Sequence, residues 1–242
     1  MKMIQEDDNE NIYWDKIADE YAEEALSIQP TFYKNAAMLL NRELADCSVV
    51  ADIGNGGVIN YKTGNFAKLD CIDLSLSRTA VEKYKDVKNI GFKEGNVLHL
   101  TEIEDGTYDA VILQCVLHHL AGHNFATTNH NVKQALMECM RILKPDGKLL
   151  IVESTVVSWF EKIERILYPV MQAFFRLVKF DTVYQYSPQS LLKLVREMNL
   201  GTILSSQIVD VGSTIWLLRR KVPTKLTPCT VEWIAVRKQR ME

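Results

Sequence analysis

Residues 49–57 read VVADIGNGG, a run of apolar residues that breaks into three glycines within four positions. Glycine has no Cβ and accepts positive φ angles, so such a loop lets the backbone approach a ligand closely. In open α/β sheets, loops of this kind lie at the carboxyl ends of the strands, where ligands bind. Two phosphate-binding patterns are excluded, because the sequence has no G-x-x-x-x-G-K-[ST] and Ile59 stands where a dinucleotide fingerprint needs glycine or alanine. By itself the stretch predicts either a ligand loop or a structural turn.

The alternation of apolar runs with helical stretches predicts the fold class. Apolar side chains at helical spacing mark residues 11–25 and 33–44 as two leading helices and residues 132–143 as a later one, which Lys144–Gly147 should end with a turn. The runs expected to form strands are CSVVADI (47–53), KLDCIDL (68–74), NIGFKEGN (89–96), YDAVILQ (108–114) and GKLLIVE (147–153). This order predicts an α/β protein whose parallel sheet is covered on both faces.

The last third of the chain predicts a different arrangement. Ser187 and Pro188 should open a helix as its N-cap and first position, and Gly201 should close it. Residues 202–210 and 230–237 follow without a clear helix between them, so we expect an antiparallel final pair of strands. The whole chain, 1–242, is expected to form a single domain, with an N-terminal helical cap over 1–46 and a helical lid insertion over 155–186.

Composition narrows the class of protein and its partners. With 47% hydrophobic and 24% charged residues, the chain is typical of a globular protein. Its acidic N-terminus does not resemble a signal peptide, its five cysteines form no C-x-x-C pair, and no stretch suggests a membrane span, so a cytoplasmic location is predicted. Residues 212–242 carry seven Lys/Arg and two Glu, but no nucleic-acid motif accompanies them, and no nucleic-acid partner is predicted.

A polar residue lies at the end of each of the next two predicted strands. Asp73 lies nineteen residues after Gly54, where its carboxylate could accept hydrogen bonds from both hydroxyls of a ribose. An isolated Asp at a strand end is more often a helix cap, and the sequence leaves that alternative open. Asn96 ends the third strand with an amide that can accept from an exocyclic amine.

These segments together resemble a known family. VVADIGNGG, CIDLS, EGNVLHL, YDAVILQCVLHHL and RILKPDGKLLIVE follow one another as in a class I S-adenosylmethionine-dependent methyltransferase, and NIYWDKIADEYAEEA looks like the helix that often covers the cofactor. The resemblance covers about residues 10–153. It implies a Rossmann-like, seven-stranded and mostly parallel sheet with an antiparallel last strand and helices on both faces. It also implies that the cofactor is S-adenosyl-L-methionine, bound over the strand ends.

The resemblance assigns roles to individual residues. Asp52, Gly54, Asn55 and Gly56 would line the methionine portion of the cofactor, and Gln114 would lie near the sulfonium. The ribose and adenine would meet Asp73, Leu74, Asn96 and Val97.

Two features depart from the family. Val58 stands where the pattern D-x-G-x-G-x-G has glycine, and Asn96 where Asp is usual. Only the ten residues VINYKTGNFA separate Gly57 from the second strand, so a first helix of normal length does not fit. We hypothesise that Tyr61 replaces a cofactor contact that this helix would have made.

Candidate groups for the chemistry follow the fourth strand. His118 and His119 in VLHHL are the nearest titratable side chains, and a neutral histidine suits proton abstraction. The same dipeptide recurs in family members of varied chemistry, so a positioning or packing role is favoured over catalysis. His123 and His130 show no metal-ligand spacing, and no metal site is predicted.

Residues 155–180 interrupt the path between the fifth strand and the next helix. Pro169 should kink or split this segment. We favour a lid over an apolar acceptor, with a homodimer surface and peripheral membrane contact as the two alternatives. Tyr184, Tyr186 and Trp216 also favour an apolar or aromatic acceptor. The apolar stripe of the segment comprises Trp159, Ile163, Ile166, Leu167, Val170, Met171, Phe174 and Phe175.

The sequence therefore predicts a methyltransferase that acts on a small, hydrophobic or aromatic molecule, similar to the quinone- and natural-product-modifying branch of the family. A fold of this kind that catalyses a non-methylating reaction is one alternative. A non-catalytic cofactor-binding protein is another.

Overall fold

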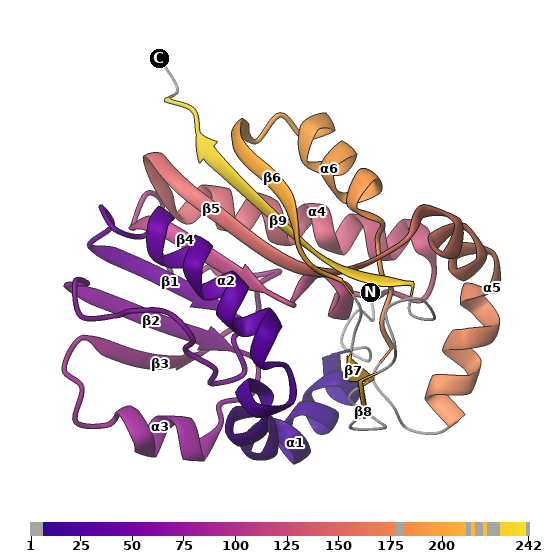
Figure 1. Cartoon of the computed structure of the whole chain (residues 1–242), viewed down its shortest axis with the longest axis horizontal. Coiled ribbons are helices and arrows are strands. Elements are labelled where there is room, and N and C mark those ends of the chain that lie inside the picture. The colour runs from indigo at the N-terminus through magenta and orange to yellow at the C-terminus, as the bar shows by residue number, and fades with distance from the viewer. Residues whose placement is uncertain (1–6, 178–181, 212–213, 216–219, 222–227, 241–242) are drawn as a thin grey trace.

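A seven-stranded sheet forms the centre of the protein (Figure 1). The computed structural model describes residues 7–177, 182–211, 214–215, 220–221 and 228–240. The strand order is β3-β2-β1-β4-β5-β9-β6, and β9 is antiparallel to both of its neighbours while the first five strands are parallel. The strands of the sheet are β1 Val49–Ile53, β2 Lys68–Asp73, β3 Ile90–Glu94, β4 Tyr108–Gln114, β5 Leu143–Val156, β6 Gly201–Val211 and β9 Cys229–Lys238. The predicted Rossmann-like sheet with an antiparallel last strand is confirmed.

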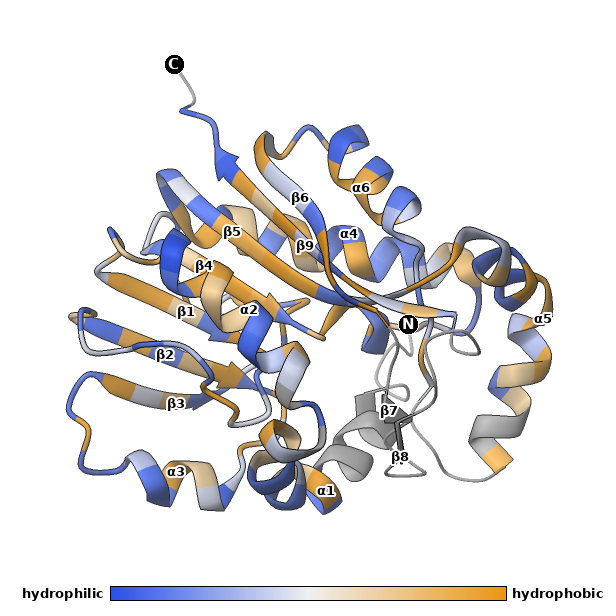
Figure 2. Ribbon diagram, in the orientation of Figure 1, coloured by the Kyte–Doolittle hydropathy of each residue, from blue (hydrophilic) through white to orange (hydrophobic). Residues whose placement is uncertain are grey.

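Helices cover both faces of this sheet. They are α1 Asp7–Ile28, α2 Pro30–Glu43, α3 Arg78–Tyr84, α4 Phe125–Ile142, α5 Ser158–Leu177 and α6 Pro188–Glu197, with a short 3₁₀ turn η1 at Leu117–His119. One face packs against the apolar sides of α4 and α6, and the other against α2. Figure 2 shows the result in the central strands β1, β4, β5 and β9, which are mostly hydrophobic along their middle, as expected for a sheet buried on both faces. No helix in the described part of the chain has the length and hydrophobicity needed to cross a membrane.

Two predicted boundaries differ from the structure. The turn expected at Lys144–Gly147 is instead a bulge inside β5, because Tyr108 pairs with Leu143 and Ala110 with Lys148, and Asp146 takes a φ of 63°. Gly201 does not close α6. The helix ends at Glu197, and Asn199 adopts the left-handed conformation, with φ 49°, before Gly201 opens β6. Asn tolerates this conformation because its short polar side chain bonds locally.

The connection between β1 and β2, residues 54–67, contains no helix. Helix α2, from before β1, covers this region, and the connection is attached to it. Asn60 Nδ2 donates to the Tyr33 carbonyl oxygen at 3.0 Å, and the Lys62 backbone N–H donates to Asn41 Oδ1 at 2.7 Å. The predicted lack of room for a normal first helix is confirmed, and side chains of α2 fill the face that such a helix would cover.

The parallel strands point toward one end of the molecule, where α1, α5 and a small hairpin gather (Figure 1). The hairpin comprises β7 Thr214–Ile215 and β8 Arg220–Lys221. It was not predicted from the sequence. The loops that follow β1, β2 and β4 begin on this side, so the candidate site lies beneath α1, α5 and the hairpin.

Candidate functional site

The glycine loop after β1 is a tight, left-handed turn. Gly54, Gly56 and Gly57 have φ angles of 69°, 58° and 77°. A Cβ on Gly54 would lie 2.7 Å from a methyl of Val116, and one on Gly56 would lie 2.7 Å from the ring of Tyr21. The loop therefore needs glycine both for its backbone angles and for the side chains packed against it.

Asp73, at the end of β2, holds this loop. Its Oδ2 accepts a hydrogen bond from the Gly56 backbone N–H at 2.9 Å, and its Oδ1 accepts from the Ser75 N–H at 3.2 Å. Burial raises the pKa of the Asp73 carboxyl, while these N–H groups act in the opposite direction. Each carboxylate oxygen has a second lone pair, so the group can organise the loop and still accept from a bound hydroxyl.

Asp52 is fully buried at the end of β1, with none of its surface exposed. Its Oδ2 accepts from the Tyr61 hydroxyl at 2.6 Å and from Asn55 Nδ2 at 3.3 Å. Burial raises the pKa of Asp52 to about 7, despite these two donors. Tyr61 thus contacts Asp52 from within the core.

Two buried acceptor atoms at this end of the sheet have no hydrogen-bond partner, Asp52 Oδ1 and Gln114 Oε1. Asp52 pairs with Ile112 across the β1–β4 register, and Gln114 lies two residues further along β4, so both side chains are on the same face. An unsatisfied buried acceptor costs about 1–3 kcal/mol. A ligand with several N–H donors, such as an ammonium group, would satisfy both atoms, and the residues therefore fit the amino-acid end of the expected cofactor.

The remaining predicted cofactor residues lie in two places. Asn55 Oδ1 accepts from the Gly57 N–H at 2.8 Å, so Asn55 supports the glycine loop. Asn96 Oδ1 accepts from the Leu98 N–H at 2.8 Å, which fixes the orientation of its amide after β3. Leu74 is partly exposed, whereas Val97 is buried in the main hydrophobic core.

Hydrogen bonds hold helix α1 over the loops after β1 and β2. Ser75 Oγ donates to Asp15 Oδ1 at 2.5 Å, and Asp19 Oδ1 accepts from the Thr79 N–H at 3.2 Å. Between these contacts and the sheet, the Tyr21 hydroxyl lies 3.0 Å from that of Tyr33. Tyr21 was counted in the sequence only as part of the apolar face of a helix. Its spacing gave no signal that it covers the glycine loop.

His118 and His119 lie on η1, directly after β4. His118 Nδ1 is 2.5 Å from Glu153 Oε1. The ring centroids of His118 and His119 are 4.0 Å apart. Glu153 is buried within β5, before its last residues, and its other oxygen accepts from the Leu117 N–H at 2.7 Å. An ionised carboxylate can only accept, so Nδ1 of a neutral His118 carries the hydrogen and Nε2 carries the lone pair. Glu153 was missed in the sequence, although it ends a predicted strand just as Asp52 and Asp73 do.

The side of α5 that faces this site is polar. Glu164 is 3% exposed, and its Oε1 accepts from the Gln185 N–H at 3.1 Å while its Oε2 has no hydrogen-bond partner. Burial and nearby Glu161 raise the pKa of Glu164 to about 7, and His118 lowers it. Rings of Tyr168 and Tyr184 meet edge to face beside these carboxyls, at 5.5 Å. Trp216 and the side chains of Phe174 and Phe175, which the sequence places near the acceptor, lie outside the described residues.

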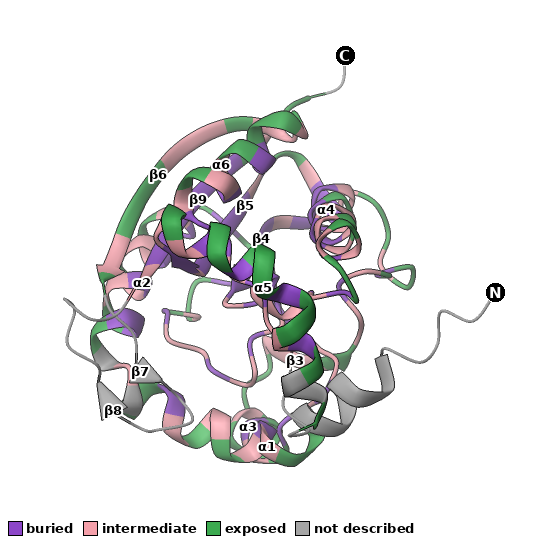
Figure 3. Cartoon of the chain, turned by 90° about the vertical axis from the view of Figure 1, so that its right-hand side faces the viewer, coloured by how far each residue is buried: buried purple, intermediate pink, exposed green. Residues whose placement is uncertain are grey.

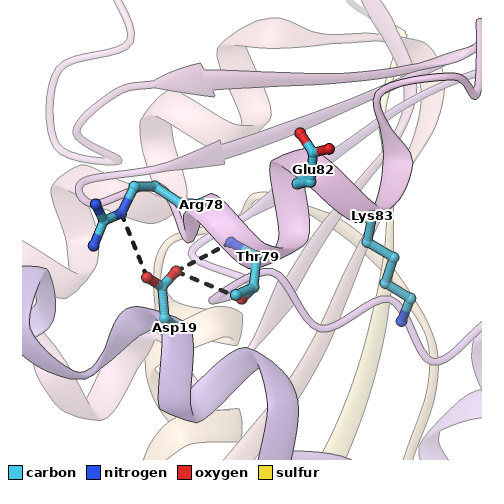
Figure 4. Close-up of a pocket in the computed structure, with 5 residues that line it drawn as sticks. All are labelled: Asp19, Arg78, Thr79, Glu82 and Lys83. Atoms are coloured by element: carbon cyan, nitrogen blue, oxygen red, sulfur yellow. Dashed lines mark hydrogen bonds and ion pairs between the residues drawn. The ribbon is translucent and has the colours of Figure 1, made fainter.

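A surface pocket of about 530 Å³ lies elsewhere, between α1 and α3 (Figure 4). Asp19 crosses it to form an ion pair with Arg78 at 3.5 Å, and Glu82 and Lys83 complete its charged rim. None of the predicted cofactor or catalytic residues lines this pocket. Its charged groups connect α1 to α3, and we assign no ligand to this pocket.

Comparison with known proteins agrees with the fold described above. Residues 51–151 match the family described as "Methyltransferase domain". The Burkholderia thailandensis 1,6-didemethyltoxoflavin-N1-methyltransferase, solved with 1,6-didemethyltoxoflavin and S-adenosylhomocysteine, is similar at a TM-score of 0.63 and 15% identity, covering 95% of this chain and 88% of that one. The N-methyltransferase NodS of Bradyrhizobium japonicum WM9, solved with S-adenosyl-l-homocysteine, is similar at a TM-score of 0.62 and 13% identity. The match covers 94% of this chain and 100% of that one.

A further match is to a much larger protein. A 98-residue stretch is 32% identical to the highly reducing polyketide synthase resH of Aspergillus sclerotiorum. This stretch makes up 37% of the chain, and it spans only 3% of the synthase.

Proposed function

We propose that the protein transfers a methyl group from S-adenosyl-L-methionine to a small molecule. The match of residues 51–151 to the family described as "Methyltransferase domain" and the similarity of the fold to solved methyltransferases support this proposal. The observation that carries the proposal is the pair of buried, unpartnered acceptors, Asp52 Oδ1 and Gln114 Oε1, beside a glycine loop at the strand ends. The similar proteins solved with S-adenosylhomocysteine support the choice of cofactor.

The cofactor site in this proposal combines three elements of the sheet. Asp52 and Gln114 accept from the ammonium of the methionine portion, the glycine loop allows close approach of its backbone, and Asp73 accepts from the ribose hydroxyls. Asn96 faces the adenine amine. When bound, the cofactor supplies an electrophilic methyl group on a sulfonium.

Tyr61 takes a supporting role here. Its hydroxyl already donates to Asp52 Oδ2, which leaves Oδ1 as the oxygen without a partner. We therefore propose that Tyr61 lies behind the site, where it acts on the cofactor through the orientation of the Asp52 carboxylate and not by direct contact.

His118 is the proposed base for acceptors that must lose a proton. Glu153 holds its Nδ1 at 2.5 Å, so in the neutral ring Nε2 carries the lone pair that would take the acceptor proton, and the buried carboxylate would stabilise the imidazolium that results. The ring of His119 contacts that of His118 at an interplanar angle of 41°, and we propose that it positions the His118 ring. Acceptors without an acidic proton need only orientation and exclusion of water.

The surroundings of His118 support an aromatic acceptor. Phe125, Tyr168 and Tyr184 form a connected set of rings, with Phe125 and Tyr184 at 5.3 Å, beneath α5. Aromatic rings favour edge-to-face or offset contacts with a flat ligand. The partners proposed for the chain are thus a small aromatic molecule and the cofactor.

The first experiment is calorimetry with S-adenosylmethionine and S-adenosylhomocysteine. We expect both to bind wild type, and Gln114→Leu, which removes one unpartnered acceptor, to bind less tightly. Failure of both ligands to bind would overturn the proposal. Transfer of a labelled methyl group to a metabolite library then identifies the acceptor.

The role of His118 needs a separate readout. With an acceptor in hand, Glu153→Gln should lower kcat and shift the pH dependence of kcat, while cofactor affinity stays unchanged. An unaltered pH profile in this variant, and in His118→Asn, would remove the assignment of a base.

A further inference from the structure

Helix α5 faces the protein with its polar side and the solvent with its apolar side. Among the described side chains of this helix, the buried ones are Glu161, Glu164 and Gln172, which are polar, and Tyr168, whose ring is in the core while its hydroxyl forms hydrogen bonds. Its exposed large hydrophobic side chains are Trp159 (62%), Ile163 (44%), Ile166 (77%), Leu167 (46%), Val170 (68%) and Leu177 (81%). Figure 3 shows α5 in front of the domain with a largely exposed outer surface. Helices on globular proteins usually have the opposite orientation.

Hydrogen bonds on the inner side fix this orientation. Tyr168 donates to the Gly122 carbonyl oxygen at 2.8 Å, and Gln172 Nε2 donates to the same oxygen. Glu161 Oε2 accepts from the Ser190 hydroxyl at 2.6 Å, and Glu164 accepts from the Gln185 N–H. Turning the helix to hide its apolar side would break all of these bonds and expose the groups that make them. The outward apolar face is therefore a feature of the fold.

This result corrects one argument made from the sequence. Trp159, Ile166 and Val170 of the stripe are exposed at 62%, 77% and 68%, so this part of it does not line a space beneath α5. The helix also continues from Ser158 to Leu177 through Pro169, so the predicted split does not occur.

Charge on the outer side indicates what covers this face. Lys162 and Arg165 are exposed, whereas both glutamates of the helix are buried beneath it. The guanidinium of Arg165 lies 4.0 Å from the ring centroid of Phe125 in α4. The described outer surface of α5 is thus apolar with cationic borders, which is the pattern of a helix that lies in the interface of an anionic lipid bilayer.

We propose that α5 is an interfacial membrane-binding helix, whose exposed apolar side chains, those from Trp159 to Val170 and Leu177, insert among the acyl chains of an anionic leaflet. Trp159 would lie at the level of the headgroups, where indole rings are enriched. Lys162 and Arg165 would pair with anionic headgroups. This proposal concerns only the free face of the helix and does not depend on methyl transfer.

Cosedimentation of the full chain with lipid vesicles tests the proposal. We expect binding to vesicles of phosphatidylcholine mixed with phosphatidylglycerol, and weaker binding to phosphatidylcholine alone. The variant Ile166→Ser/Val170→Ser should lower the partition coefficient by at least about tenfold, and Lys162→Glu should lower it only on the anionic vesicles. The matched control is Met38→Ser/Met137→Ser, which changes exposed apolar side chains on α2 and α4 (60% and 47%) and should bind as wild type does.

Three results would overturn the proposal. One is absence of binding to either vesicle type, and another is equal loss of binding in the control variant. The third is a homodimer in light scattering that Ile166→Ser/Val170→Ser dissociates while vesicles capture nothing, which would assign the face to a second copy of the chain. Urea unfolding of each variant checks that the domain is intact, which we expect because all five substituted side chains are exposed.

Discussion

Replacing Asp52 with Asn should make the folded protein less sensitive to pH. Asp52 is fully buried, and its pKa rises from 3.8 to about 7 in the folded state. A carboxyl whose folded-state pKa is raised binds its proton more tightly in the folded state. Its contribution to stability is full below the unfolded-state pKa and is lost as the pH rises through the folded-state value. Between pH 5 and pH 8, the loss for this shift amounts to roughly 2.5 kcal/mol.

Urea unfolding of wild type and Asp52→Asn at the two pH values measures this quantity directly. We expect the free energy of unfolding of wild type to fall more steeply from pH 5 to pH 8 than that of the variant, by about 2.5 kcal/mol. The asparagine oxygen can still accept from the Tyr61 hydroxyl, so the core is retained. Parallel pH dependences in the two proteins would refute the reasoning. Calorimetry on the same samples should show cofactor binding weakened by about tenfold or more, because a charged acceptor is lost.

Three further substitutions probe the loop and the helices that cover it. Asp73→Ala should weaken binding of S-adenosylhomocysteine by about tenfold or more, whereas Asp73→Asn, which keeps an acceptor, should lose less; equal affinity of Asp73→Ala and wild type in calorimetry would contradict the assignment. Gly56→Ala should destabilise the protein by about 2 kcal/mol or more, since its φ is 58° and the new methyl would meet Tyr21. The control Gly64→Ala, with nothing within 4 Å, should unfold like wild type. Glu164→Gln should stabilise the protein at pH 8 by roughly 2 kcal/mol and at pH 5 by much less, because the raised pKa of this carboxyl, about 7, costs stability only as the pH rises; unfolding curves that shift equally at both pH values would disprove this.

The fold could be predicted from the sequence because each buried strand is a short apolar run between turn residues. The parallel order and the antiparallel end followed from the alternation with helices and from its loss after residue 201. The two wrong boundaries, at the end of α6 and at the start of β5, lie where a different local structure replaces the expected one. Asn199 occupies the left-handed position that glycine usually takes, and a bulge replaces the expected turn at Lys144–Gly147.

The candidate site was only partly accessible from the sequence. Asp73 and the glycines lie together because parallel strands bring their carboxyl ends to one edge. The contact between Tyr61 and Asp52 could not be predicted, since it depends on how an irregular connection returns beneath the sheet. The orientation of α5 was also hidden. A helical stripe shows which side chains share a face, but the partners of the opposite, polar face decide which way that face points.

Because the β1–β2 connection has no helix, the N-terminal segment covers this part of the sheet. Phe32, Tyr33 and Leu40 of α2 are in the same buried cluster as Val50 of β1 and Leu69 of β2. The first two strands thus acquire their cover from a segment made earlier in synthesis, rather than from the residues between them. A deletion or domain fusion that begins at β1 would leave half a core exposed, so for any recombinant design the smallest transferable unit starts at α2.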